Sequence, residues 1–201
     1  MQVLLALLAC IGSSAFLPPP TPSPALVSTQ RRVSQQQGSS KADGKELYII
    51  RPGLPEEKQG IQEILIGMIM NPLSIDINNF LCAEERETRA LIGFGQVRPI
   101  GNSSYELASL HVSESHRQRG LGSRLVRQLV EDFVSTYGSD QLYLITLEKT
   151  APFYEKNGFI IIPPNDAPAA LRAERAVGSF VQSFFGNSLV CMQVNPRIRS
   201  A

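Results

Sequence analysis

The chain has 201 residues, of which 43 % are hydrophobic and 18 % charged, and its formal net charge is +1. This composition fits one compact domain with a tail, and without a basic excess it gives nucleic-acid binding no electrostatic support. The three cysteines form no Cys-x-x-Cys pair and have no zinc-ligand spacing with either histidine. We therefore expect neither a metal site nor a disulfide framework.

The N-terminus has the features of a targeting segment. Residues 3–11 are apolar but too few to span a bilayer, and small residues follow, which predicts a signal-peptide-like segment over 1–15 and no stable membrane insertion of the mature chain. Residues 16–45 are rich in Pro and Ser, lack acidic residues before Asp43 and are expected to be disordered. Phe16 directly follows the small residues at the end of the signal-like segment. Together the two segments resemble the bipartite transit peptide of algae with secondary plastids. The resemblance implies the plastid stroma; the alternative is a secreted or endomembrane protein.

The first half of the expected domain, residues 46–201, alternates short apolar runs with turn signals. Pro55 and two glutamates open a helix whose apolar residues have helical spacing. The expected elements are a strand at 47–50, a helix from Pro55 to near Asn71–Pro72, and strands at 80–83, 90–100 and 105–112. The three later strands form an antiparallel meander.

The second half changes pattern, since an almost continuous apolar run at 142–147 is typical of a buried parallel strand. The expected elements are helices at 120–136, 151–157 and 169–185 and strands at 142–147, 159–162 and 188–194. A strand, a helix and a parallel strand imply a right-handed crossover. The fold class is thus mixed α/β (α+β), with no internal repeat.

One loop carries the clearest chemical signal. The strand ending at Val112 is followed by Arg117-Gln118-Arg119-Gly120-Leu121-Gly122, which leads directly into a helix. The first turn of a helix has free N–H groups and a partial positive charge, and glycines let a pyrophosphate approach the backbone. The spacing matches neither a dinucleotide fingerprint nor a nucleoside-triphosphate loop.

Two motifs together resemble the GNAT superfamily of acyl-CoA N-acyltransferases. The first is Arg117-x-x-Gly120-x-Gly122 after a hydrophobic strand, and the second is the segment from Ala151 to Phe159, a helix that carries Tyr154 and closes on Gly-Phe. The resemblance implies a single GNAT-like domain with a mixed, mostly antiparallel sheet. It also implies a central pair of splayed parallel strands and helices on both faces.

The resemblance also implies how acetyl-CoA is bound as co-substrate. The pantetheine arm would pair with backbone groups at the strand end, at Leu110, His111 and Val112, and Arg117 would add charge. The pyrophosphate would be held by the loop amides, which are those of Gln118, Arg119, Gly120, Leu121, Gly122 and Ser123.

Two catalytic residues follow from the same resemblance. Tyr154 takes the position of the family's general acid, and its phenol, with a reference pKa of about 10 against about 8.5 for a thiol, can protonate the departing CoA sulfur. Glu106 lies six residues before Val112, the spacing of the catalytic base in lysine-acetylating histone acetyltransferases of the superfamily. A solvent-facing or arginine-paired carboxylate is the alternative for Glu106, and His111 or ordered water are further candidates for the base.

The resulting hypothesis is an acetyl-CoA-dependent N-acetyltransferase that acts on an amine. The acceptor stays open between protein lysines, protein N-termini and small amines, because the acceptor regions at 61–80 and 163–187 contain no motif. A noncatalytic acyl-CoA sensor is the alternative function, and a homodimer is left open.

Overall fold

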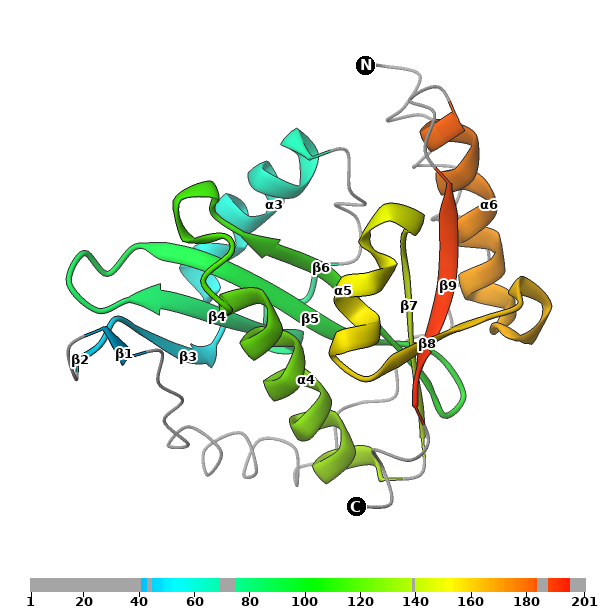
Figure 1. Ribbon diagram of the computed structural model, residues 1–201, viewed down its shortest axis with the longest axis horizontal. Coiled ribbons are helices and arrows are strands. Elements are labelled where there is room, and N and C mark those ends of the chain that lie inside the picture. The colour runs from blue at the N-terminus through cyan, green and yellow to red at the C-terminus, as the bar shows by residue number, and fades with distance from the viewer. Residues whose placement is uncertain (1–40, 43–44, 69–74, 139, 184–187, 196–201) are drawn as a thin grey trace. The chain divides into compact units, whose positions relative to one another are not determined.

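The computed structural model describes residues 41–42, 45–68, 75–138, 140–183 and 188–195 (Figure 1). Within these residues, seven strands form one mixed sheet in the order β3-β4-β5-β6-β7-β9-β8. The described residues fall into two compact units, the first made of 41–97 and 107–138 and the second of 98–106 and 140–195. Strands β5 and β6 contribute residues to both units.

The strands are β1 (Lys41–Ala42), β2 (Lys45–Glu46), β3 (Tyr48–Pro52), β4 (Phe80–Glu85), β5 (Leu91–Gly101), β6 (Ser104–Val112), β7 (Gln141–Leu147), β8 (Phe159–Ile162) and β9 (Leu189–Val194). The α-helices are α3 (Lys58–Gly67), α4 (Leu121–Tyr137), α5 (Ala151–Lys156) and α6 (Ala169–Ser183). Short 3₁₀ turns lie at Pro55–Glu57, Ile77–Asn79, Glu114–His116, Glu148–Thr150 and Pro164–Asp166.

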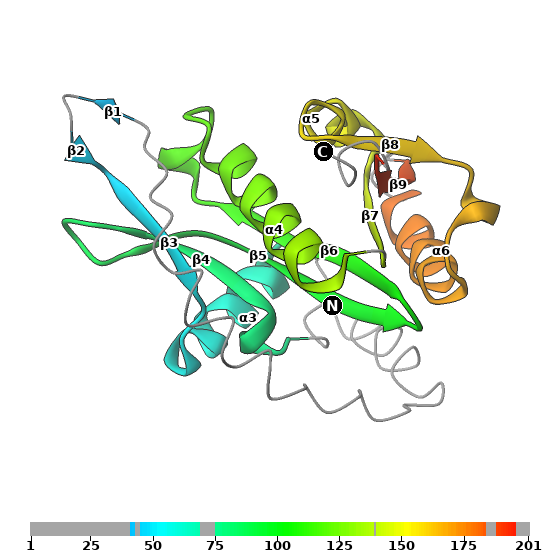
Figure 2. The ribbon, with the colours of Figure 1, turned by 90° about the horizontal axis from the view of Figure 1, so that it is seen from below.

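In the first unit, α3 and α4 cover opposite faces of the strands (Figure 2). Because side chains alternate along a strand, neighbouring residues of β4 serve different helices. Cys82 packs with Ile61 and Leu65 of α3, whereas Ala83 packs with Leu125 of α4. Each helix thus buries its apolar stripe against its own face of the strands.

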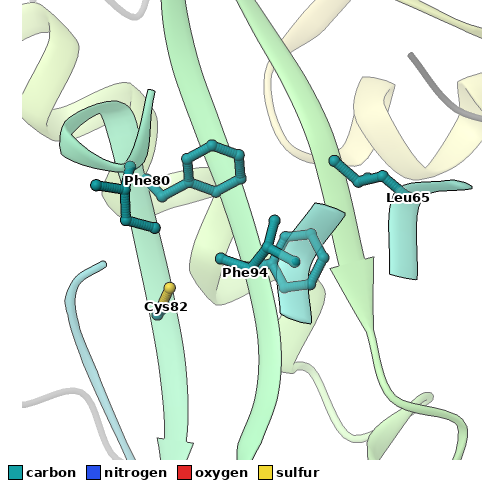
Figure 3. Packing of buried hydrophobic residues seen from close by; sticks show 6 residues of the cluster. Leu65, Phe80, Cys82 and Phe94 are labelled. Atoms are coloured by element: carbon teal, nitrogen blue, oxygen red, sulfur yellow. The ribbon is translucent and has the colours of Figure 1, made fainter. Parts of the chain in front are cut away.

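On the side of the strands covered by α3, two phenylalanine rings form the centre of the core. Phe80 of β4 and Phe94 of β5 are almost fully buried, with ring centroids 6.0 Å apart, and Figure 3 shows them with Cys82 and Leu65. Burying a side chain of this size stabilises the fold by about 1.5–3 kcal/mol. The cluster anchors α3 to β4 and β5.

In the second unit, β9 lies between β7 and β8 and pairs antiparallel with both. Cys191 of β9 has Ile145 and Ile162 as its cross-strand partners, and Leu171 of α6 packs in the same cluster. Figure 2 shows α5 and α6 on opposite faces of these strands. The buried thiol of Cys191 is therefore part of the core.

The parallel pair of the sheet is β6–β7, and its register joins Ser104–Glu106 to Gln141–Tyr143. The paired stretch takes in three residues from each strand, although β6 has nine residues and β7 has seven. The pairs β3–β4 and β4–β5 are antiparallel. The predicted α/β fold class, a mixed sheet with one parallel pair and helices on both faces, is confirmed.

Most predicted elements agree with the structure within two residues, and one boundary is wrong. The first helix, expected to end near Asn71–Pro72, ends at Gly67. Met68 has φ −90° and ψ 2°, which leaves the helical region, while its N–H still bonds to the Ile64 carbonyl. Glycine in the last turn weakens the helix because it has the most backbone freedom to lose.

The predicted N-terminal segments lie almost wholly outside the described residues. Strands β1 and β2 form a two-stranded sheet at the end of the stretch expected to be disordered, and residues 1–40 are not described. None of the helices within the described ranges is long and apolar enough to cross a membrane.

Candidate functional site

The loop before α4 has a backbone that only a glycine-containing sequence adopts easily. Gln118 has φ 60° and Gly120 has φ 82°, both in the left-handed region. Gly120 is the N-cap of α4, and its carbonyl accepts a hydrogen bond from the Arg124 N–H at 3.0 Å. A Cβ built on Gly120 would meet no atom within 4 Å. The space beside Gly120, at the start of α4, is thus open.

The charges around this loop favour an anion. Arg117, Gln118, Arg119 and Gly120 are exposed, whereas Leu121 is buried and fixes the start of the helix. The first-turn N–H groups add the positive end of the 17-residue helix dipole. The predicted pyrophosphate-binding residues from Arg117 to Ser123 therefore form one continuous loop and helix start, which is exposed from Arg117 to Gly120.

Two glycines of β5 bring α4 close to the strands. A Cβ on Gly93 would lie 3.0 Å from the His111 carbonyl oxygen and 3.2 Å from Leu125 Cδ1. A Cβ on Gly95 would lie 3.0 Å from Leu129 Cδ1. These distances are shorter than ordinary van der Waals contact, so both positions need glycine for helix α4 to pack at this depth.

The end of β6 presents its backbone beside the loop. The guanidinium of Arg117 folds back, and its Nε donates a hydrogen bond to the Val112 carbonyl at 2.9 Å. Leu110 and Val112 pack against the α4 side of the unit. This places Leu110, Val112 and Arg117, three of the predicted acyl-CoA residues, in one unit with the loop.

His111 points to the opposite side of β6. Its ring stacks on Phe94 with centroids 5.0 Å apart, and its Nδ1 lies 3.0 Å from the Met68 sulfur. Burial, followed by the positive charge of Arg117, lowers the pKa of His111. His111 is therefore neutral at neutral pH, which a general base requires.

Sequence reasoning missed a residue of β6 with a left-handed backbone conformation. Ser109 has φ 57°, a left-handed conformation that costs a non-glycine residue free energy, and it is buried. Its Oγ accepts a hydrogen bond from Gln96 Nε2 at 3.0 Å. The signal was present as Gln96, a long polar residue within an apolar strand, since a buried amide requires a partner.

Glu106 is buried in the second unit and holds an ion pair. Arg98 donates to its Oε2 from Nε at 2.8 Å and from Nη2 at 2.6 Å, and also donates to Glu174 at 2.6 Å. Burial raises the pKa of Glu106 to about 7, against the influence of Arg98, which favours the carboxylate. A pKa near 7 suits a general base, whereas the pairing with Arg98 is the arrangement expected if Glu106 is an arginine-paired carboxylate without a catalytic role.

Tyr154 is buried on α5 in the second unit. Its ring makes edge contacts with Phe153 at 4.9 Å and Phe159 at 6.0 Å between centroids. Gly158, with φ 90°, ends the turn after α5. Burial raises the pKa of Tyr154 to about 12, so the phenol keeps its proton throughout the physiological range and is available as a proton donor.

Within the described ranges, no group of three or more His, Cys, Asp or Glu side chains is placed to hold a metal ion.

Comparison with known families gives a match to the part of the chain that contains both sequence motifs. Residues 76–161, from the turn before β4 into β8, match the family model for the acetyltransferase (GNAT) domain. Residues 76–161 are therefore similar to a GNAT acetyltransferase domain. This is the domain of an acyl-CoA-dependent N-acyltransferase. No curated protein matches the chain.

Solved structures share the fold of this acetyltransferase domain at low identity. Rv2747 from Mycobacterium tuberculosis, in complex with CoA and a second ligand, is 17 % identical with a TM-score of 0.57, covering 73 % of this chain and 98 % of that one. N-acetylglutamate synthase from Neisseria gonorrhoeae, complexed with CoA and N-acetyl-glutamate, is 16 % identical with a TM-score of 0.57. That match covers 75 % of this chain but only 36 % of the synthase.

A third structure is a chimera of the spermidine N-acetyltransferase SpeG from Vibrio cholerae and hSSAT, which is 13 % identical with a TM-score of 0.51. The match covers 76 % of this chain and 98 % of the chimera. At these identities, the likeness to the acetyltransferase domain is one of fold.

Proposed function

We propose that this chain transfers the acetyl group of acetyl-CoA to an amine. The observation that carries the proposal is the open loop before α4, where the position of a Gly120 Cβ is empty and Arg117 and Arg119 are exposed. Free helix-start amides with adjacent arginines suit the pyrophosphate of a CoA thioester. Two solved structures of the same fold contain CoA, which supports acetyl-CoA as the co-substrate.

The proposed reaction is direct attack. The amine nitrogen bonds to the thioester carbonyl carbon, the carbon–sulfur bond breaks, and the sulfur leaves with a proton. Tyr154, whose raised pKa keeps it protonated, donates that proton or a hydrogen bond to the sulfur. The backbone of Leu110, His111 and Val112 binds the pantetheine arm.

The amine must lose a proton to a base. We propose Glu106, because burial brings its pKa to about 7, close to the working pH of a base. Arg98 holds one of its oxygens, so His111 and an ordered water stay as alternatives.

The acceptor is proposed to be a primary amine of a small metabolite or of a protein. The names of two fold relatives indicate small-amine acceptors, namely N-acetylglutamate synthase and a spermidine N-acetyltransferase. Lysine side chains and protein N-termini are the other candidates. The panel for the test therefore includes glutamate, spermidine and peptides with free lysines and N-termini.

The test is incubation of the purified protein with acetyl-CoA and this panel, followed by mass spectrometry. We expect one class of amine to gain an acetyl group. Tyr154→Phe should lower kcat by about 10²-fold or more while acetyl-CoA still binds, since proton transfer contributes roughly 10²–10⁴-fold. Gly120→Asp should abolish CoA binding. A chain that neither binds CoA nor acetylates any amine would refute the proposal.

The second candidate is a noncatalytic acyl-CoA sensor. One observation favours it: the carboxylate proposed as the base is already paired with Arg98 at 2.6–2.8 Å. A sensor would bind acetyl-CoA and show no transfer, and Tyr154→Phe and Glu106→Gln would change nothing. Calorimetry with acetyl-CoA beside the transfer assay distinguishes the two functions.

We also propose that residues 1–45 direct the chain to a plastid. The support is the apolar run, the small residues before Phe16 and the acid-free stretch that follows. Fusion of residues 1–45 to a fluorescent protein in an alga with a secondary plastid tests this. Fluorescence in the secretory pathway would favour the alternative destination.

A further inference from the structure

His116 links two segments of the first unit that are distant in sequence. Its Nε2 lies 3.2 Å from Oε1 of Glu85, the last residue of β4. Its Nδ1 lies 2.9 Å from the hydroxyl oxygens of both Ser113 and Ser115. A carboxylate accepts only, so the partners assign the proton to Nε2, and in the neutral ring Nδ1 accepts from a serine hydroxyl.

The Glu85 side of this link is itself held in place. The Thr88 hydroxyl donates to Glu85 Oε2 at 2.6 Å, and the Ala90 N–H donates to the Thr88 oxygen at 3.2 Å. The Arg89 N–H donates to the Glu85 carbonyl at 2.9 Å. Residues of the turn that follows β4 therefore hold the Glu85 carboxylate in place, independently of its contact with the imidazole.

The other side of the link leads directly into the phosphate-binding loop. The Ser113 N–H donates to the Ile92 carbonyl at 2.9 Å, which ties this residue to β5. One 3₁₀ turn, Glu114–His116, follows, and Arg117 then returns to an extended conformation. Gln118 and Gly120 come next with their left-handed φ angles. His116 is thus the last side-chain anchor that precedes the exposed loop residues 117–120.

We propose that Glu85 and His116 are positioning residues that hold the loop in the conformation that receives the pyrophosphate of acetyl-CoA. The inference rests on the proposed function of the loop. Amides that already point at the ligand bind it without a further cost of ordering, so loss of the brace weakens CoA binding and leaves the chemical step intact.

An ordinary surface ion pair is the competing explanation, and exposed pairs contribute little to stability. The two differ in what they predict for the loop. A surface pair affects neither the exchange of loop amides nor the affinity for CoA, whereas the brace controls both.

The experiment compares Glu85→Ala, Glu85→Gln and the control Glu87→Ala, which alters an exposed glutamate of the turn that follows β4. The side-chain oxygen of glutamine can accept the same hydrogen bond from His116 Nε2, so Glu85→Gln should retain most of the brace. Hydrogen–deuterium exchange of residues 113–123 is measured in the free protein, CoA affinity by calorimetry, and KM and kcat with acetyl-CoA.

For Glu85→Ala we expect faster exchange confined to 113–123 and a dissociation constant for CoA about three- to tenfold higher, as expected for one lost hydrogen bond to a charged group at a partly exposed site. KM for acetyl-CoA should rise with it, and kcat should stay unchanged. Glu85→Gln should have amide exchange and CoA affinity close to those of the wild type, and Glu87→Ala should equal the wild type in both.

Wild-type exchange and affinity in Glu85→Ala would overturn the inference, as would faster exchange without a change in affinity. Faster exchange throughout the chain would show a general loss of stability and overturn it as well. If the wild type binds no CoA, the proposed function and the role of the brace both fail; if CoA binds and no amine is acetylated, only the transfer proposal fails.

Discussion

Replacement of Gly120 by alanine tests two effects of the loop conformation, one on the free energy of unfolding and one on the affinity for CoA. The residue has φ 82° and ψ −5°, where an L-residue is disfavoured by about 1–2 kcal/mol. No atom lies within 4 Å of the added Cβ, so no packing penalty is added to this backbone cost. The expected loss in the free energy of unfolding is thus about 1–2 kcal/mol, and each kcal/mol lowers Tm by about 2–4 °C in a chain of this size.

Two further variants make the measurement specific. Gly120→Asn puts a Cβ in the same place, but asparagine tolerates the left-handed region, so it should lose less stability than alanine. Gly60→Ala makes the same chemical change within α3, also in open space, and should raise the free energy of unfolding by up to about 1 kcal/mol because alanine favours the helix.

Urea denaturation and calorimetry with CoA are the assays. Both Gly120 variants should bind CoA at least tenfold more weakly than wild type, since the added Cβ would occupy space beside the first-turn amides that we propose bind the pyrophosphate. Gly60→Ala should bind CoA normally. The reasoning is refuted if Gly120→Ala unfolds at the wild-type urea concentration. It is also refuted if Gly120→Ala loses stability but keeps full CoA affinity.

Three other predictions concern packing, pH and thiol reactivity. Gly93→Ala should lower the free energy of unfolding by about 1–3 kcal/mol in urea, because its Cβ would lie 3.0 Å from the His111 carbonyl oxygen; an unchanged midpoint would contradict this contact. Burial raises the folded-state pKa of Glu106 to about 7, so the folded chain keeps a proton that the unfolded chain has released, and stability should fall as pH rises from 5 to 8. In Glu106→Gln the free energy of unfolding should depend less on pH. If urea denaturation gives the same pH dependence for the variant and the wild type, Glu106 is not the group responsible. Burial raises the pKa of Cys82 to about 12, so Cys82 should resist a thiol reagent at pH 8 until the protein unfolds, which mass spectrometry of the labelled peptide can follow.

The local parts of the fold could be predicted because their causes are local. Helix α4 begins within one residue of its expected start, since Gly120 and the apolar spacing that follows both mark it. Phe159–Ile162 was expected as a strand and is β8. Both acyltransferase motifs likewise depend on residues close together in sequence.

The missing parts depend on contacts that sequence spacing does not reveal. Glu106 could be marked as a candidate base, but its pairing with Arg98 and the sharing of that arginine with Glu174, 76 residues away in sequence, come from the tertiary fold. The insertion of β9 between β7 and β8 is equally remote from any local pattern. The left-handed Ser109 has no local signal, because nothing but its buried partner Gln96 identifies it.

The alternation Gly93-Phe94-Gly95 in β5 also governs how the first unit assembles. A slip of one residue in the pairing of β5 would exchange its two faces and put the Phe94 ring where Leu125 and Leu129 leave room only for a hydrogen atom. Helix α4 can pack only on a β5 strand that is paired in the correct register, so its packing disfavours pairings of β5 that are shifted by one residue. Correct alignment of β5 is therefore a condition for placing both α4 and the loop that precedes it.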